Sequence, residues 1–210
     1  MARALIEKNE AYYSRAPRRL AAFFVARPEA ARKALHFLIA LSPLIALASL
    51  QAAAALLLYG ALGYSAMEIA RLSGARVPAV SALTALVSRR AGRFEAGPLT
   101  LAAGALLSLL LFSPAVATAA IFALAFGDGC AGLVGRLYGS VRPAFLYGKS
   151  VEGSLSCLVA TGLSVYLFSQ NAPAALVAAI VATLVEALPL KDWDNLALPL
   201  AVGFALSGIL

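Results

Sequence analysis

The residues best suited to chemistry lie in three short segments that combine carboxylates with basic side chains. The first segment contains Asp128 and Arg136, the second contains Lys149 and Glu152, and the third runs from Glu186 to Asp194. Carboxylates bind Mg²⁺, and lysine or arginine neutralises phosphate oxygens. These residue types together are the ones needed for Mg²⁺-assisted transfer of a phosphorus-containing group.

Asp128 is followed by three glycines at the spacing of one helix face. Gly132, Gly135 and Gly139 stand four, seven and eleven residues after it, so that one stripe of a helix carries all four residues. Such a stripe lets a nucleotide approach closely, with an acidic metal ligand at its end. The alternative is a small-residue face on which membrane helices pack.

The second segment begins a predicted helix. Residues 148–154 read Gly-Lys-Ser-Val-Glu-Gly-Ser, and the amino terminus of a helix presents free N–H groups to phosphate oxygens. Lys149 adds a positive charge there. Ser150 and Ser154 either contact the nucleotide or cap the helix.

The composition requires a membrane setting for this chemistry. Of the 210 residues, 62% are hydrophobic and 13% are charged, which is too few charges to cover the surface of a soluble domain of this size. A soluble enzyme is therefore excluded. Two cysteines and one histidine also exclude a disulfide scaffold and a histidine-rich metal site.

The charges divide the chain into membrane hairpins. All 27 charged residues lie within residues 3–33, 68–95, 128–152 and 186–194. The uncharged stretches 34–67, 96–127 and 153–185 are each too long for one span of a hydrocarbon core about 30 Å thick. Each should form two helices, with breaks at Leu50-Gln51, at Ser113-Pro114 and within residues 169–173. With residues 195–210 as a last span, the sequence predicts an all-α polytopic membrane protein of about seven transmembrane helices.

The hairpins place every charged segment on one side of the membrane. These segments carry eight, five, three and one basic residues, and the positive-inside bias makes this side, with the amino terminus, cytoplasmic. The spans are short, so we expect the helices to continue past the charge boundaries. We divide the chain into a basic cytoplasmic or interfacial arm, residues 1–33, and a transmembrane catalytic domain, residues 34–210.

Three motifs in this order resemble one enzyme family. They are Gly127-Asp128-x-x-Ala131-x-x-x-Gly135-Arg136-x-x-Gly139, the 148–154 turn, and Glu186-Ala-Leu-Pro-x-x-Asp-x-Asp194-Asn195-x-x-x-Pro199. Together with Arg32-Lys33-x-x-His36 and Glu68-x-x-Arg71, they resemble the CTP-dependent lipid-alcohol kinases, which include dolichol, phytol and CTP-dependent diacylglycerol kinases and are related to phosphatidate cytidylyltransferase. Two departures from the family pattern are a short loop between Gly139 and Gly148 and the pair Gly129-Cys130 in place of a pair with serine or threonine.

The resemblance implies transfer of the γ-phosphoryl group of CTP to the hydroxyl of a membrane lipid. The positions of the charges, all on one side of the predicted hairpins, place the site at the cytoplasmic face. The implied partners are CTP, a lipid alcohol, Mg²⁺ and the membrane, without nucleic acid. The candidate catalytic residues are Asp128, Lys149, Glu152 and His36. The candidate metal ligands are Asp128, Glu152, Glu186 and Asp194. The candidate nucleotide-binding residues are Gly132, Gly135, Arg136, Gly139, Gly148, Ser150, Gly153, Ser154 and Asn195.

Several of these residues have structural alternatives. Arg136 could serve topology alone, Glu186 could pair with Lys191, and His36 could be an interface residue. Asn195 serves either cytosine or ribose recognition or the backbone groups freed by Pro199. Glu68 and Arg71, three residues apart, are expected to form a structural ion pair.

Two other functions remain as alternatives at this point. A cytidylyltransferase would attack the α-phosphate of CTP and release pyrophosphate, but the 148–154 turn resembles the kinase form. A small ion-coupled transporter would bury charges at mid-depth, whereas the charges here lie at one face. The acceptor alcohol is left open.

Overall fold

The computed structural model describes residues 32–74 and 94–210, and every regular element within them is helical. This confirms the all-α prediction for the described residues. Only Arg32 and Lys33 of the predicted arm fall within them, and both belong to a helix over residues 32–39. The rest of the arm, and residues 75–93 of the second charged segment, lie outside the described residues.

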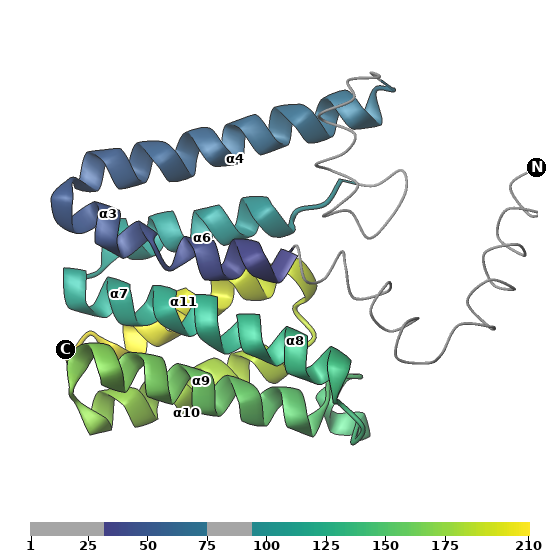
Figure 1. Ribbon diagram of the computed structural model, residues 1–210, viewed down its shortest axis with the longest axis vertical. Coiled ribbons are helices and arrows are strands. Elements are labelled where there is room, and N and C mark those ends of the chain that lie inside the picture. Colours follow the sequence, from purple (N-terminus) through teal and green to yellow (C-terminus); the bar gives the residue numbers. More distant parts are fainter. Residues whose placement is uncertain (1–31, 75–93) are drawn as a thin grey trace, which may run out of the picture.

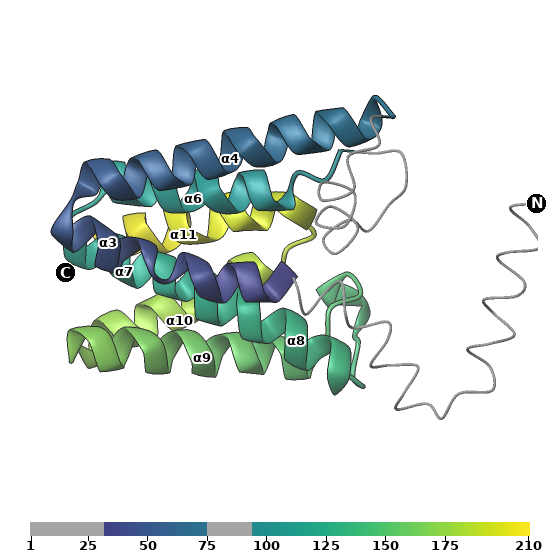
Figure 2. The same cartoon turned by 45° about the horizontal axis from the view of Figure 1, so that its top comes forward.

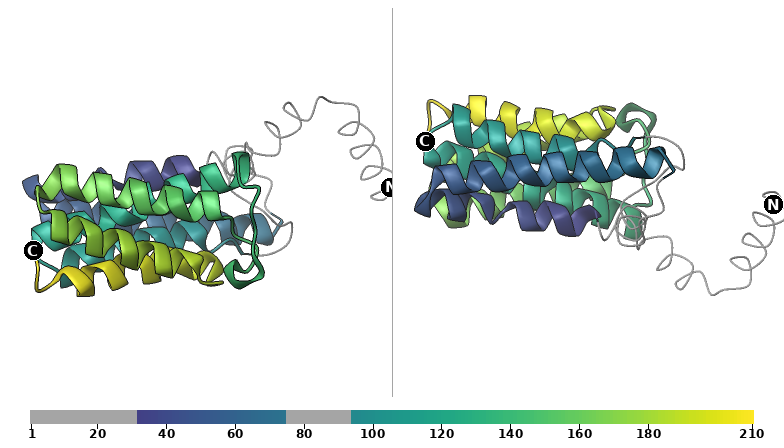
Figure 3. Two further views of the ribbon diagram at one scale, coloured as in Figure 1. Left: turned by 90° about the horizontal axis from the view of Figure 1, so that it is seen from below. Right: turned by 90° about the horizontal axis from the view of Figure 1, so that it is seen from above.

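The helices form side-by-side hairpins (Figures 1 and 3). Residues 32–39 and α3 (Ser42–Ala48) lead into α4 (Leu50–Leu72), and α6 (Gly97–Leu111) leads into α7 (Pro114–Phe122). A π-helical turn (Ala123–Asp128) continues α7 into α8 (Gly129–Leu137). The remaining α-helices are α9 (Val151–Ser169), α10 (Ala172–Ala187) and α11 (Asp194–Leu206), and short 3-10 turns at Ala144–Leu146 and Lys191–Trp193 precede α9 and α11.

The three hairpin turns are fixed by capping residues. Ser49 accepts a hydrogen bond from the Ala52 N–H at 3.2 Å, Ser113 caps α7, and Asn171 accepts one from the Ala174 N–H at 3.0 Å. These side chains satisfy N–H groups that have no partner within the helix. Two turns lie where the sequence placed them, whereas the first is at Ser49 rather than at Leu50-Gln51, because the serine is the better cap.

Three of the helices are long and apolar enough to cross a membrane. They are α4, the continuous rod Pro114–Leu137 and α9, while α6 and α10 are shorter apolar helices. As expected, α4 runs past Glu68 to Leu72, and the rod runs past Asp128 to Leu137. The uncharged stretch 34–67 contains a second helix break that was not predicted, at Ala40–Leu41 just before Pro43. Seven spans and a cytoplasmic amino terminus stay predictions.

All the loops with charged residues that the structure describes lie at one end of the bundle. The tight turns and the carboxyl terminus lie at the other end (Figure 1). We call the end that contains the loops 138–150 and 188–193 the polar end. Figure 2 shows α4 and α6 along one side of the bundle, with α8, α9 and α10 along the other.

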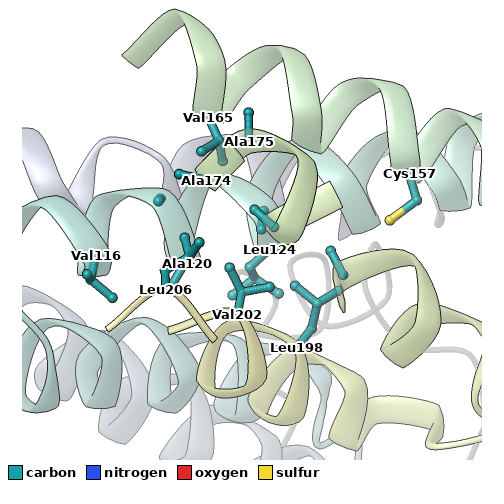
Figure 4. Packing of buried hydrophobic residues seen from close by; sticks show 14 of the residues in the cluster. Val116, Ala120, Leu124, Cys157, Val165, Ala174, Ala175, Leu198, Val202 and Leu206 are labelled. Atoms are coloured by element: carbon teal, nitrogen blue, oxygen red, sulfur yellow. The ribbon is translucent and has the colours of Figure 1, made fainter. Parts of the chain in front are cut away.

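The core lies between α7, α9, α10 and α11 (Figure 4). Leu124, Leu198 and Val202 are completely buried there. Alanines supply much of the rest, including Ala178 and Ala182 of α10. Within a lipid bilayer, no hydrophobic effect drives helices together, so their packing depends on dispersion contacts. Small side chains let the helices approach closely and thereby increase these contacts. This core fixes the helix ends that carry the polar residues.

Candidate active site

A cavity of about 480 Å³ opens at the polar end. It joins residues 32–36, α8, the start of α9, the end of α10 and the start of α11. Most of the predicted site residues line it, along with several that the prediction omitted. The lining residues are Arg32, Lys33, His36, Asp128, Ala131, Gly132, Gly135, Arg136, Arg142, Gly148, Lys149, Ser150, Gly153, Glu186, Lys191, Asp192, Asp194 and Asn195.

Asp128 lies at the centre of the buried charges in this cavity. Its Oδ2 atom lies 2.6 Å from Lys33 Nζ and 3.0 Å from His36 Nδ1. All three side chains are almost fully buried. Lys33 and His36 reach the carboxylate from 95 and 92 positions earlier in the chain. They belong to the helix over residues 32–39, the first helix that the structure describes, which therefore forms one wall of the site. The predicted catalytic pair of Asp128 and His36 is therefore in direct contact.

Asp128 is the last residue of the π-helical turn. A π-turn inserts an extra residue into a helix, and such turns are frequent at functional sites. Here the turn changes the register between the apolar face of α7 and the glycine face of α8. Sequence spacing alone gave no indication of it.

The amino terminus of α9 faces the same cavity. Ser150 caps the helix by accepting a hydrogen bond from the Gly153 N–H at 3.1 Å. Tyr147 and Gly148 adopt left-handed backbone conformations, with φ of 51° and 89°, which turn the chain into the helix. The capping interpretation of Ser150 is confirmed, and the residue also lines the cavity.

Lys149 connects this terminus to the third motif. Its Nζ atom donates to the Glu186 carbonyl and lies 3.1 Å from Glu186 Oε1 and 3.9 Å from Asp194 Oδ2. Ser154 lies outside the cavity lining, with its Oγ atom 3.4 Å from Glu186 Oε2. The ion pair of Glu186 is thus with Lys149, in place of the Lys191 alternative.

The glycine stripe lets neighbouring groups approach α8 closely, and its contact with a nucleotide stays a prediction. Gly132 and Gly135 line the cavity, and a Cβ atom on Gly132 would collide with the side chain of Lys33. A Cβ atom on Gly135 would lie 3.0 Å from Ser150 Oγ and 3.4 Å from Gly153 Cα. The stripe therefore lets α8 pack on α9 and lets Lys33 reach Asp128. Gly139 packs against Ser150 outside the cavity lining.

Glu152 does not lie where the sequence analysis placed it. Its carboxylate accepts hydrogen bonds from the Ser140 hydroxyl and from the N–H groups of Ser140 and Val141, at 3.0 and 3.1 Å. It is outside the cavity lining. The first turn of α9 points this side chain toward the 138–150 loop, so in this structure Glu152 holds the loop rather than joining the other carboxylates.

Arg142 is a cavity residue that the sequence analysis did not select. Its guanidinium donates to the carbonyls of Gly135 and Gly148, at 2.7 and 2.6 Å, and thereby ties the end of α8 to the turn before α9. Arg32 and Asp192 form another cavity pair, at 3.2 Å. Both lie within the motifs that carry the family resemblance, whereas no sequence signal marked Arg142.

Asn195 has a mainly structural set of contacts. Its amide donates to the Gly97 carbonyl at 3.1 Å and to Thr100 Oγ1 at 3.2 Å, joining α11 to the start of α6. Pro199 supplies no N–H to the Asn195 carbonyl, and that carbonyl packs on Gly104, where a Cβ atom would collide. Asn195 also lines the cavity, so contact with a nucleotide stays a prediction.

The donor set of the cavity suits a hard cation that keeps phosphate and water ligands. Among residues 32–74 and 94–210, no three Asp, Glu, His or Cys side chains are clustered closely enough to enclose a metal ion by themselves. Mg²⁺ is commonly bound by only one or two carboxylates together with substrate phosphates. The contacts of Asp128 with Lys33 and His36 both use Oδ2, which leaves Oδ1 for a metal ion.

The predicted ion pair of Glu68 and Arg71 is confirmed, and it lies outside the cavity lining. Arg71 Nε and Nη2 donate to the two carboxylate oxygens at 2.8 and 2.6 Å, and the Glu95 N–H donates at 3.0 Å. Glu68 is completely buried. Through Glu95, the pair fixes the end of α4 beside the chain that enters α6.

Replacing this buried carboxylate should reduce stability without removing the chemistry. Glu68→Gln takes away the charge opposite Arg71, and we expect a loss of roughly 2–3 kcal/mol in the free energy of unfolding. Thermal unfolding of the detergent-solubilised protein, followed by tryptophan fluorescence, measures the change. An unfolding midpoint equal to that of the wild type would contradict a structural role.

The sequence matches plant proteins of one kind. It is 33% identical over 124 residues to a probable phytol kinase 1 of the chloroplast from Glycine max, covering 50% of this chain and 41% of the relative. It is 33% identical over 154 residues to the protein of the same name from Oryza sativa subsp. japonica, covering 63% of this chain and 48% of the relative. The chain thus spans less than half of the length of these curated relatives.

Two other comparisons gave no match. No family model matches the sequence, and no solved structure matches it. Both plant proteins are named as the kind of enzyme that the motifs resemble, and the structure brings many of the motif residues to one cavity. The chain is thus similar, over part of its length, to two proteins named as probable phytol kinases, which are of the kind that its motifs resemble.

Proposed function

We propose that this protein is a CTP-dependent kinase that transfers the γ-phosphoryl group of CTP to the hydroxyl of a membrane lipid alcohol, giving a lipid phosphate and CDP. The observation that carries the proposal is the single cavity that gathers Asp128, His36, Lys149 and the amino terminus of α9. It lies at the polar end of an apolar bundle, where a water-soluble nucleotide and a membrane alcohol can meet. The predicted topology directs this end to the cytoplasm.

The basic residues of the cavity supply phosphate binding. Six lysines and arginines line it against four carboxylates, and a triphosphate carries the negative charge that this excess of cations favours. The buried Nη1 atom of Arg32 has no hydrogen-bond partner among residues 32–74 and 94–210. Binding of a phosphate oxygen would satisfy that donor. Lys149 and the α9 amino terminus supply a second point of contact.

Asp128 is the proposed principal ligand of Mg²⁺, with Glu186 or Asp194 as the second carboxylate. The ion would neutralise charge on the transferred phosphoryl group. The position of Glu152 in the structure argues for leaving it out of this set. Lys149, which contacts both Glu186 and Asp194, holds these carboxylates beside the phosphate-binding helix terminus.

His36 is the proposed base for the lipid hydroxyl. If the proton of the neutral imidazole is on His36 Nδ1, which lies 3.0 Å from Asp128 Oδ2, the other ring nitrogen can accept the proton that the hydroxyl releases on attack. Lys33 donates a hydrogen bond to the same oxygen, Asp128 Oδ2, and partly neutralises the negative charge of this carboxylate. The oxygen–phosphorus bond to the acceptor then forms as the bond to the CDP leaving group breaks.

The reaction type can be tested with labelled nucleotide. Purified protein in detergent with Mg²⁺ and phytol, which the names of the plant relatives suggest as a first acceptor, should transfer label from the γ-position of CTP to the lipid. CDP should appear in equal amount, and EDTA should stop the transfer. Label arriving from the α-position, with release of pyrophosphate, would overturn the kinase proposal in favour of a cytidylyltransferase.

A further inference from the structure

A second cavity, of about 400 Å³, lies on the other side of the first helix. It runs between residues 35–45, α4 and α6, and we call it the apolar groove. Its lining residues are Leu35, Leu38, Ile39, Leu41, Ser42, Ile45, Leu56, Leu57, Gly60, Ala61, Tyr64, Pro98, Leu101 and Ala102. None of them is charged.

The helix over residues 32–39 separates the groove from the active-site cavity. Arg32, Lys33 and His36 line the cavity, whereas Leu35 and Ile39 line the groove. Positions 32, 33 and 36 share one face of a helix, and positions 35, 38 and 39 share another. A molecule in the groove is thus one helix width from the residues that contact Asp128.

The groove also reaches the polar end along its other two walls. Tyr64 lies near the end of α4, and its hydroxyl donates to the Glu95 carbonyl at 2.9 Å. Pro98 is in the first turn of α6, next to Gly97, where a Cβ atom would lie 3.0 Å from Arg32 Nη2. From Tyr64 the α4 wall descends to Leu56, a length of about 12 Å at the helical rise per residue.

The lining determines the chemistry of an occupant. Tyr64 already uses its hydroxyl hydrogen, and Ser42 donates its own to the Ile39 carbonyl at 2.8 Å. The remaining surface is hydrocarbon, so it suits an alkyl or isoprenoid chain and offers nothing to a charged headgroup. Leu38, Leu41 and Leu56 are half or more exposed, so the groove is open to the membrane side of the bundle.

We infer that the apolar groove binds the hydrocarbon tail of the acceptor alcohol and directs its hydroxyl around the first helix to His36 and Asp128. This inference rests on the proposed function and adds the path by which the lipid reaches the nucleotide. The acceptor enters sideways between the first helix and α4, with its hydroxyl toward the polar end. The groove then makes the enzyme sensitive to the tail of its substrate.

Gly60 offers a direct way to fill the groove. It lines the groove, and nothing lies within 4 Å of the position that its Cβ atom would take. Gly63, on the same helix, is equally open but does not line the groove. Gly60→Phe and Gly63→Phe therefore form a matched pair that differs mainly in where the ring is placed.

The pair should separate long acceptors from short ones. With phytol, G60F should raise KM by about tenfold or more relative to G63F, because the ring occupies the volume of the tail. With 3-methylbut-2-en-1-ol, which has a single isoprene unit, the kcat values of the two variants should agree within about twofold. Equal KM values of G60F and G63F for phytol would overturn the inference. Equal losses with both alcohols would do so as well.

A binding readout separates this inference from the proposed function. A long-chain alcohol with a photoreactive diazirine in its tail should label peptides of α4 and α6 in the wild-type protein, and excess phytol should compete with it. Labelling confined to α9 and α10, as from bulk lipid, would overturn the groove assignment. Wild-type protein that phosphorylates neither alcohol, and none of polyprenol, dolichol and diacylglycerol, would overturn the proposed function, whereas the labelled peptides would still decide whether the groove binds a tail.

Discussion

Asp128→Asn should lower turnover by roughly 10³-fold while the protein still folds and inserts into membranes. The substitution keeps the shape of the side chain and removes the charge that faces Lys33, His36 and the proposed Mg²⁺. A neutral amide binds Mg²⁺ far more weakly than a carboxylate, and it no longer accepts the charge-assisted hydrogen bond of Lys33. Single-turnover transfer from γ-labelled CTP measures the loss directly.

Glu68→Gln is the matched control for this experiment. Glu68 and Asp128 are both buried carboxylates, and each is paired with a basic side chain, Arg71 or Lys33. Only Asp128 lines the cavity. We expect the Glu68 variant to lose stability and to keep its turnover per folded molecule, whereas the Asp128 variant should lose turnover per folded molecule by far more than any loss of folded protein explains. Near-normal turnover of Asp128→Asn would reduce Asp128 to a packing residue and remove the metal site from the proposal.

Single cysteines at the two ends of the bundle should react from opposite sides of the membrane. Phe145, in the loop before α9, is 74% exposed, and Ala172, at the turn into α10, is also exposed. In a background with Cys130→Ala and Cys157→Ala, the predicted topology places position 145 on the cytoplasmic side and position 172 on the far side. A membrane-impermeant maleimide on inside-out vesicles should label Phe145→Cys almost completely and Ala172→Cys almost not at all.

The structure guides the choice of these two positions. Arg142 is in the same loop as Phe145, but its guanidinium ties the end of α8 to the turn before α9, so a cysteine there would disturb the loop. Asn171 caps α10, and Ala172 beside it leaves the cap in place. Labelling of both cysteines from one side would discard the hairpin topology together with the cytoplasmic site built on it.

The sequence by itself determined the helical class, the hairpin turns and the end of the bundle at which the charges gather. Each of these follows from local or one-dimensional information. Uncharged stretches of more than thirty residues cannot cross a membrane once, and Ser113 and Asn171 cap the helices that follow them. The ion pair of Glu68 and Arg71 could also be predicted from the sequence, because residues three apart on a helix are neighbours.

Only some of the residues of the candidate site could be predicted from the sequence. The motifs named Asp128, Lys149, Glu186 and Asp194, and all four line the cavity. The motifs could not show that Glu152 points away, because a helix start fixes where a residue lies in the chain but not which neighbour its side chain meets. The role of Arg142 depends on two carbonyls that the fold of the loop brings within its reach.

Only the tertiary structure decided which residues surround Asp128. Lys33 and His36 come from a helix nearly a hundred residues earlier, and a π-helical turn sets the register of the aspartate toward them. Such contacts depend on how the helices pack, through the alanine-rich core and the glycines that let α8 approach α9 and Lys33. The same packing gives the first helix a polar face toward the cavity and an apolar face toward the groove. Sequence periodicity marks the two faces, but the neighbours of each face are set by side-chain packing between distant segments.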